Sequence, residues 1–270
     1  MNRFPEEATI DSKVQEIVRF IEKPRRCSYL PAEVASLECR GVADMSPAEY
    51  EDLLARGYRR FGWQVFRPVC SACTKCRSVR VLVQRFEPNA SERRILRKNQ
   101  HIRAELHPLF VTREHVDLYN RYHAFMSEHR GWPANQTTAE SFRLEFLSGA
   151  SRSGRQWLYF DEDRLVGVAF MDQVPNAISL VYCFYEPEWR AKSPGTFSIL
   201  NQLLYAKELN LEHAYLGYWI EECPSMSYKG RFGPAEILET YPAEDAAPVW
   251  IARTPIPKIL TPISPTPSPT

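Results

Sequence analysis

Three cysteines at a C-x-x-C-x-x-C spacing, Cys70, Cys73 and Cys76, constrain this chain most. Thiolates this close in sequence can share one metal ion or one iron–sulfur cluster, which forces the local backbone into a tight turn. A fourth thiol is needed, and Arg80 stands where a local one would follow. Cys27 is the best remote candidate, and Cys39 is the second. The sequence leaves open an iron–sulfur cluster, a zinc ion, or three reduced cysteines in a turn.

Composition places the chain among soluble globular proteins. It has 270 residues, of which 44% are hydrophobic and 25% charged, ample for a sizeable core. No run approaches the ~18 apolar residues that a membrane helix needs. The first residues are acidic and lack an apolar stretch, so no secretory signal is expected. Because the seven cysteines suggest no disulfide framework, the expected compartment is a reducing cytoplasm.

Basic residues concentrate directly after the cysteines. The net charge of the whole chain is only +1, but residues 77–103 carry eight basic and two acidic side chains, a local excess of +6. Such a segment can pair with phosphates, and binding through it weakens as salt rises. The alternative is a solvated helix face whose arginines cover neighbouring apolar groups.

The first half of the chain carries several helix and strand signals. An apolar stripe predicts a helix over Ser12–Ile21. A capping box, a proline at the first helical position and a glycine stop predict another over Pro47–Arg56. Alternating valines predict a strand over Val79–Phe86, and a helix with a basic face is predicted over Ser91–Ile102.

The second half changes period near residue 156. Before that point helices are predicted over Arg113–Arg130 and over Thr138–Leu147, the latter opened by Thr137 in a capping box. Beyond it, short alternating runs joined by turn residues predict an antiparallel meander of three strands, over residues 156–160, 165–174 and 178–185.

A helix opened by Ser193-Pro194-Gly195-Thr196 follows, and then a strand over Ala214–Ile220. Strand, glycine-bearing turn, helix and strand in this order are typical of an acetyltransferase-like fold. In that fold the helix N-terminus faces the donor, and its backbone N–H groups receive an anion or a carbonyl oxygen. The order favours this fold but is shared by many α/β units.

We therefore predict an α+β protein in three parts. A cysteine- and arginine-rich module spans residues 1–105, and an acetyltransferase-like mixed sheet with flanking helices spans 106–253. The tail, 254–270, has six prolines in 17 residues and is expected to be disordered.

Several of these segments occur together in one known family. They are Cys27-x-Tyr29-Leu30, Gly57-Tyr58-Arg59-Arg60, Phe66-Arg67-Pro68-x-Cys70-x-x-Cys73-x-x-Cys76, Val79-Arg80-Val81, Tyr215-Leu216-Gly217-Tyr218-Trp219-Ile220 and Cys223-Pro224-x-Met226-x-Tyr228-Lys229-Gly230. In this order, over roughly residues 25 to 240, they resemble the aminoacyl-tRNA–protein transferases. Two branches are relevant: the arginyltransferases, and the bacterial relatives that attach leucine to N-terminal Asp or Glu.

The resemblance implies the acetyltransferase-like fold and a cytoplasmic enzyme. That enzyme would transfer one amino acid from aminoacyl-tRNA to proteins that begin with Asp or Glu, which marks them for degradation. The short chain and the cysteine spacing favour leucyl-tRNA, whereas residues 223–230 are at least as close to the arginyl branch. The other hypotheses are a small-molecule N-acetyltransferase and a non-catalytic adaptor that binds RNA or protein ends.

Such a reaction needs a neutral acceptor amine, a polarised ester carbonyl and a cation for the acidic residue. The candidate catalytic residues are Tyr228, Lys229 and Glu222. The candidate substrate-binding residues are Arg80, Arg93, Arg94, Arg231, Tyr182, Tyr218, Ser193, Gly195 and Thr196. The candidate metal ligands, for a cluster or zinc, are Cys27, Cys70, Cys73 and Cys76. No other cofactor and no membrane partner are expected.

Aromatic side chains gather on the two predicted central strands. Tyr182 and Tyr218 are expected either to contact the aminoacyl group or the terminal adenosine, or to be plain core. Strict alternation would put Tyr218 on one face with Leu216, and Tyr215 with Trp219 on the other.

Overall fold

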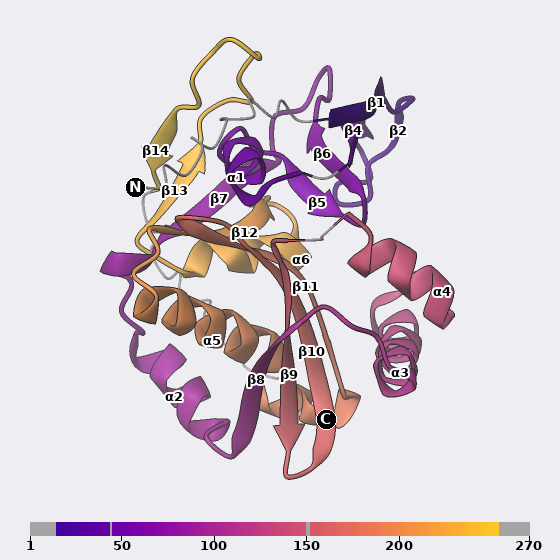
Figure 1. The fold of residues 1–270 in the computed structure, drawn as a ribbon, viewed down its shortest axis with the longest axis vertical. Helices are drawn as coiled ribbons and strands as arrows, with labels where there is room; N and C mark the ends of the chain where they lie inside the picture. The colour runs from indigo at the N-terminus through magenta and orange to yellow at the C-terminus, as the bar shows by residue number, and fades with distance from the viewer. Residues whose placement is uncertain (1–14, 44, 150–151, 254–270) are drawn as a thin grey trace, which may run out of the picture.

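The computed structural model describes residues 15–43, 45–149 and 152–253, which are organised around one mixed sheet (Figure 1). In the described part this sheet has eight strands, in the order β14-β13-β7-β12-β11-β10-β9-β8. Neighbouring strands are antiparallel except for the parallel pair β11–β12. The strands are β7 (Arg77–Leu82), β8 (Ile102–Pro108), β9 (Gly154–Asp161), β10 (Arg164–Gln173), β11 (Ala177–Tyr185), β12 (His213–Trp219), β13 (Ala235–Leu238) and β14 (Trp250–Ala252).

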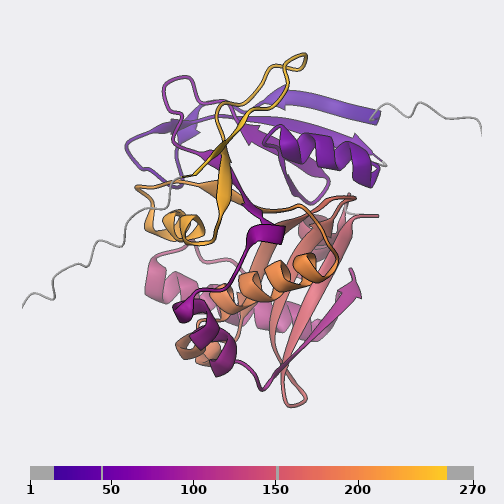
Figure 2. The ribbon, with the colours of Figure 1, turned by 90° about the vertical axis from the view of Figure 1, so that its left-hand side faces the viewer.

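A smaller layer built from the N-terminal residues lies over one end of this sheet, at the top of Figure 2. Its four-stranded sheet has the order β1-β4-β6-β5, and a two-stranded ladder, β2–β3, lies beside it. The elements are β1 (Gln15–Ile21), β2 (Arg25–Arg26), β3 (Val34–Ala35), β4 (Leu37–Ala43), α1 (Pro47–Ala55), β5 (Arg59–Phe61) and β6 (Gln64–Pro68).

The helix predicted over Ser12–Ile21 is wrong, because the described part of that segment is strand β1. β1 pairs antiparallel with β4 along its length. The expected stripe is not buried, since Ile17 and Ile21 are each more than two-thirds exposed. Long-range pairing of a segment rich in β-branched residues therefore overrides a weak helical period.

The other predicted helices of the first half form with shifted ends. α1 has the predicted capping box of Ser46 and Glu49. α2 (Ala90–Lys98) starts after an Asn89 cap and stops early, because Ile102 begins β8. The strand predicted over Val79–Phe86 runs as β7 and then turns into the 3₁₀ segment η1 (Val83–Arg85).

The helix predicted over Thr138–Leu147 is not uniform. It consists of α4 (Ala139–Phe142) and a π-helical turn, η2 (Arg143–Leu147). Its cap is Thr138, whose hydroxyl accepts from the Ser141 N–H, and not Thr137. Asn120 holds the backbone of Thr137 from α3, so a tertiary contact sets where the helix starts.

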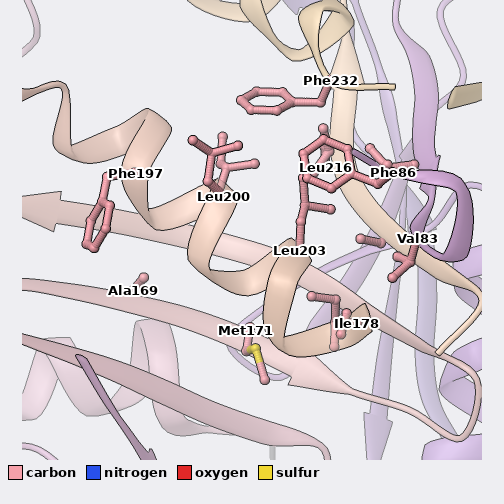
Figure 3. Packing of buried hydrophobic residues seen from close by; sticks show 14 of the residues in the cluster. Val83, Phe86, Ala169, Met171, Ile178, Phe197, Leu200, Leu203, Leu216 and Phe232 are labelled. Atoms are coloured by element: carbon pink, nitrogen blue, oxygen red, sulfur yellow. The ribbon is translucent and has the colours of Figure 1, made fainter. Parts of the chain in front are cut away.

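Helices α3 (Arg113–Arg130) and α5 (Pro194–Glu208) cover opposite faces of the sheet (Figure 1). α3 has its predicted bounds, and α5 starts where a helix was predicted to open. Alternation along β10 sends Met171 towards α5, where Leu200 and Leu203 are fully buried (Figure 3). The neighbouring Phe170 packs in the cluster under α3. The predicted meander is confirmed, because β9, β10 and β11 pair antiparallel in sequence order.

Strands β11 and β12 separate after a short parallel contact. They pair only where Ala177–Ser179 meets His213–Tyr215, although both strands continue. The diverging parts, 180–185 of β11 and 216–219 of β12, are called the fork below. α5 is the crossover helix between these strands, so the predicted acetyltransferase-like mixed sheet with flanking helices is confirmed.

The two layers are joined by a buried ion pair. Arg60 on β5 donates from Nη2 and Nε to Asp172 on β10, at 2.7 and 3.0 Å. β7 precedes residue 105 and β8 crosses it, yet both belong to the large sheet, so the boundary predicted there does not separate two sheets. The tail predicted to be disordered lies outside the described residues. Among the described residues no helix is long and apolar enough to cross a membrane.

Candidate active site

A cavity of about 670 Å³ opens at the fork. Its walls are the diverging part of β11, the first turns of α5 and the C-terminal end of α3. The fourth wall is the segment after β12, which forms α6 (Pro224–Ser227) and the 3₁₀ turn η4 (Tyr228–Arg231). The separation of the two parallel strands thus creates the space, and the elements around it supply the side chains.

The N-terminus of α5 faces this cavity without a side-chain cap. Ser193 precedes it in a left-handed conformation, with φ of 59°, and makes no capping hydrogen bond. Pro194 has no N–H, so the first free backbone donors are those of Gly195 and Thr196. As predicted, Ser193, Gly195 and Thr196 are brought together at one wall. Their position suits an anion or a carbonyl oxygen.

Lys229 lies at the inner end of the cavity wall. Its Nζ donates to the Tyr218 carbonyl oxygen at 3.1 Å. Burial and the nearby positive charge of Arg59 lower the pKa of Lys229 to about 7. No carboxylate pairs with this ammonium in the part of the chain that the structure describes. Lys229 is therefore only partly protonated near pH 7, and a negative partner from outside the protein would favour its charged form.

Arg59, from β5 of the N-terminal layer, fills the point where the fork opens. Its Nη2 donates to the Leu180 carbonyl of β11 at 2.8 Å and to the Tyr215 carbonyl of β12 at 3.5 Å. These carbonyls lie at the end of the β11–β12 ladder. Arg59 thus satisfies backbone groups that the separation leaves open, and it also sets the charge next to Lys229.

Tyr182 and Tyr228 line the cavity from opposite walls. The Tyr182 hydroxyl is 2.9 Å from Nε2 of His123 on α3, and His123 stacks on Tyr119. Burial lowers the pKa of His123, which favours the neutral ring. Burial raises the pKa of Tyr228 to about 12, so its phenol stays protonated at neutral pH.

Tyr218 does not line the cavity, and the predicted strand faces are wrong. A β-bulge between Tyr215 and Gly217 interrupts the alternation, and Gly217 has φ of 90°. Beyond the bulge Tyr218 points to the N-terminal layer, where its hydroxyl donates to the Phe66 carbonyl at 2.9 Å. Trp219 instead joins the core under α5 with Leu216. One inserted residue reverses every face that follows it.

Replacing Gly217 by alanine is expected to destabilise the protein by about 1–2 kcal/mol, because a side chain at positive φ is strained. A Cβ there would also lie 3.2 Å from Lys229 Nζ and would displace it. Urea unfolding measures the loss. Gly195→Ala is the matched control, since a Cβ at Gly195 meets no atom within 4 Å. Equal stability of the two variants would contradict the expectation.

The predicted arginines and Glu222 lie outside the cavity lining. Arg80 is held by Glu236 at 2.7 Å and stacks on Trp250. Arg93 and Arg94 are exposed on α2, and Arg231 is exposed at the end of η4. Glu222 is half-exposed and lies 3.6 Å from Lys75 Nζ. The structure therefore brings together Lys229, Tyr228, Tyr182 and the α5 N-terminus, but not these five.

Two cavity cations were not predicted. Arg130 is the last residue of α3, and Arg190 lies in η3 (Pro187–Lys192), just before α5. Both side chains are exposed, and Arg190 lies over the ring of Phe125. A basic residue in the last turn of a helix usually complements the helix dipole, so the sequence gives Arg130 an ordinary explanation. That Arg130 also lines the cavity depends on how α3 packs beside the fork, which the sequence does not show.

The four candidate metal ligands lie in the N-terminal layer as free, half-buried thiols. Cys27 Sγ accepts the Leu30 N–H at 3.5 Å, and Cys70 Sγ lies 3.7 Å from the Ser36 carbonyl oxygen. Among the described residues no three His, Cys, Asp or Glu side chains are grouped to hold a metal ion. Burial, and after it the neighbouring Cys27, Cys70 and Cys73, raise the pKa of the Cys76 thiol to about 12, so the four candidates lie near one another. The metal site stays a prediction.

Elemental analysis of the purified protein tests that prediction. If the site forms, one equivalent of zinc, or iron with sulfide, is expected, and Cys73→Ser should lose it. Cys39→Ser tests the second candidate for the fourth ligand, and because Cys39 is buried on β4 this variant is expected to keep the metal. Fully active wild-type protein that contains neither metal would overturn the prediction.

Two family models match the chain in order. The model of the arginine-tRNA-protein transferase N terminus matches residues 25–94, and the model of its C terminus matches residues 114–239. Together they cover more than half of the chain, which therefore belongs to the arginine-tRNA-protein transferase family and is an aminoacyltransferase.

Bacterial relatives agree with the family models. The chain is 37% identical over 234 residues to an aspartate/glutamate leucyltransferase of Helicobacter hepaticus, covering 87% of this chain and 97% of the relative. It is 36% identical over 228 residues to the enzyme of that name from Marinobacter nauticus, covering 84% and 95%.

Solved structures with a similar fold are more distant. The structure of L-PGS from Bacillus licheniformis has a TM-score of 0.42 at 12% identity, covering 62% of this chain and 49% of that one. PaiA N-acetyltransferase from Thermoplasma acidophilum in complex with coenzyme A has a TM-score of 0.30 at 16% identity, covering 40% and 75%.

Proposed function

We propose that this protein transfers leucine from leucyl-tRNA to proteins whose N-terminal residue is Asp or Glu. One observation carries the proposal: the cavity lining has three cations, Arg130, Arg190 and Lys229, but no Asp or Glu among the described residues. An acidic acceptor residue finds a partner in such a lining. The guanidinium of an arginyl donor would find only other cations. The names of the bacterial relatives point to the same donor.

Apolar side chains offer a place for the leucyl group. Met126 and Trp132 reach the cavity from α3 and the segment after it, and Phe170, Leu180 and Tyr182 reach it from the sheet. An isobutyl group gains roughly 1.5–3 kcal/mol by leaving water for such a surface. The aminoacyl side chain therefore belongs at this part of the cavity, apart from Lys229.

The α5 N-terminus is suited to the ester carbonyl. Backbone N–H groups of Gly195 and Thr196 would hydrogen-bond its oxygen and stabilise the negative charge that develops when the amine attacks. The acceptor amine forms the new C–N bond, and the bond from the carbonyl carbon to the ribose oxygen breaks. The amine loses one proton and the ribose oxygen gains one.

Tyr228 is placed to move that proton. Its phenol is protonated at neutral pH and lines the cavity, so it can donate to the departing ribose oxygen and recover the proton of the new amide nitrogen. Glu222, another of the candidate catalytic residues, is half-exposed beside Lys75 and lies outside the lining. The relay through Tyr228 is therefore the route that the geometry favours.

Lys229 is placed to bind the carboxylate of the acceptor. A negative partner would offset the desolvation of its ammonium and raise its pKa from about 7, so the bound complex holds the charge. An uncharged Asn or Gln at the acceptor N-terminus would leave the ammonium uncompensated. The requirement for Asp or Glu at the acceptor N-terminus thus follows from one enclosed side chain, Lys229.

A transfer assay tests the proposed function. Radiolabelled leucyl-tRNA and arginyl-tRNA are offered in parallel to peptides that begin with Asp, Glu, Asn or Ala. Leucine incorporated only into the Asp and Glu peptides is the expected result. If arginine is incorporated instead, leucyl-tRNA is not the donor. If folded protein incorporates neither amino acid, the proposed transfer reaction is wrong. We further propose that the reaction takes place in the cytoplasm and marks its targets for degradation.

A further inference from the structure

Six cations without a carboxylate partner in the described part of the chain lie on α2, on η3 and at the end of α3, and we name this set the basic track. It consists of Arg94, Arg97, Lys98, Lys192, Arg190 and Arg130. Lys192 is half-buried and the others are exposed. None of the six pairs with a carboxylate among the described residues. Arg103, by contrast, is paired with Glu105 and Asp163.

Hydrogen bonds join the α2 part of the track to its η3 part. Asn99, the residue after α2, donates from Nδ2 to the Lys192 carbonyl at 2.9 Å and accepts from Trp189 Nε1 at 2.8 Å. Lys192 Nζ is 2.8 Å from Nε2 of His101. The C-terminal end of α2 is therefore fixed against η3, the segment that leads into α5 and the cavity.

The outward direction of the α2 cations follows from packing. Ile95 and Leu96 pack against the core under α5, and Glu92 is buried as the capping partner of Asn89. Arg94, Arg97 and Lys98 are left on the solvent side of the helix. At the other end of the track Arg190 and Arg130 both line the cavity. The track thus runs from α2 to the cavity mouth.

We infer that the basic track binds the phosphodiester backbone of the tRNA acceptor end, an inference that rests on the proposed function. The reacting ester is at the extreme 3′ end of the donor. A cavity of about 670 Å³ accommodates the aminoacyl group and the terminal nucleoside, so the phosphates that follow must lie outside it. The track offers them a row of cations without competing carboxylates.

Charge distinguishes this partner from the acceptor protein. The acceptor contributes one carboxylate, which the enclosed Lys229 can match. A nucleic-acid strand carries one negative charge per nucleotide, and an extended row of exposed cations fits that repeat.

A triple variant, Arg94→Ser with Arg97→Ser and Lys98→Ser, removes three cations from the solvent side of α2. Arg113→Ser with Arg143→Ser is the control, on exposed residues of α3 and η2 away from α2.

Two donors separate this inference from the proposed function. With leucyl-tRNA, the triple variant is expected to show a KM raised about 10- to 100-fold. The slope of log KM against log salt concentration should be smaller by roughly two to three than in the wild type, because each phosphate contact contributes about 0.7–0.9 to that slope. With 3′-O-leucyl-adenosine, which has no phosphate, the triple variant and the wild type should react equally. The control variant should match the wild type with both donors.

Three results would overturn the inference. They are an unchanged KM for leucyl-tRNA, an equal loss with leucyl-adenosine, and a raised KM for the acceptor protein instead. If wild-type protein uses neither donor, the proposed function fails by itself. Filter binding of uncharged tRNA to wild type and triple variant then still tests the track, with weaker binding by the variant as the expected result.

Discussion

Replacing Lys229 by methionine is expected to lower kcat/KM for an Asp-starting peptide by roughly 30-fold to several thousand-fold. Truncating one partner of a buried charge pair costs about 2–5 kcal/mol, and each 1.4 kcal/mol is a factor of ten. The variant should also stop distinguishing Asp-starting from Asn-starting peptides, because the enclosed ammonium is the cation proposed to read the carboxylate. Steady-state transfer assays with both peptides measure the two effects.

The same variant is expected to be at least as stable as the wild type. In the folded protein the pKa of Lys229 is about 7, below its ordinary value of 10.5, so the unfolded chain binds more protons between these values. Wild-type stability should therefore rise with pH from about 7 to about 10.5, and it should be lowest, on this account, below pH 7. The methionine variant lacks this dependence. Thermal unfolding at pH 6 and pH 9 compares the two proteins.

Lys207→Met is the matched control for Lys229. Lys207 is also a lysine near the core, but it is bound to Glu87 and to the Phe86 carbonyl at the far end of α5. Its replacement should leave acceptor choice unchanged. If Lys229→Met keeps the preference for Asp over Asn, Lys229 does not read the acceptor. If it loses activity and stability together, its role is structural.

Arg60→Met is expected to destabilise the protein by about 3–5 kcal/mol. The Arg60 and Asp172 side chains are 3% and 0% exposed, and the replacement would leave the Asp172 carboxylate buried without its partner. The buried hydroxyl of Tyr50 adds to the polar environment at this joint. Urea unfolding, with the midpoint and slope both fitted, measures the loss.

A double replacement separates the ion pair from the packing around it. Arg60→Met combined with Asp172→Leu removes both charges, and stability should recover most of the loss, since a well-packed apolar pair often equals a buried ion pair. Arg113→Met is the control, because Arg113 is 95% exposed and its partner Asp117 is half-exposed. A single Arg60→Met variant as stable as that control would show that the pair does not hold the layers together.

Local signals made part of this fold predictable. α3, α5 and the three-strand meander depend on caps, turns and periods contained within each segment, and all of them form. β1 depends on β4, a partner about 20 residues away, so its own apolar stripe was misleading. The bulge at Gly217 is equally invisible to a pattern of alternation.

The site was predictable where one segment contains it. Ser193, Gly195 and Thr196 share the first turn of one helix, and Tyr228 and Lys229 share one turn after β12. Arg130 and Arg59 reach the site only through the packing of distant elements, so no spacing announced them. Glu222 and Arg80 were predicted as site residues because they are charged and close in sequence to the central strands. In the structure Glu222 lies beside Lys75 and Arg80 pairs with Glu236, both outside the cavity lining.

Arg59 has a consequence for how members of this family can be recombined. It comes from the half of the chain matched by the N-terminal family model, yet it closes the ladder between strands of the other half and borders Lys229. A chimera that joins the first half of one relative to the second half of another would replace this guanidinium together with its surroundings. The two matched regions therefore meet at the site, and a first half without an arginine at this position would change the charge next to Lys229.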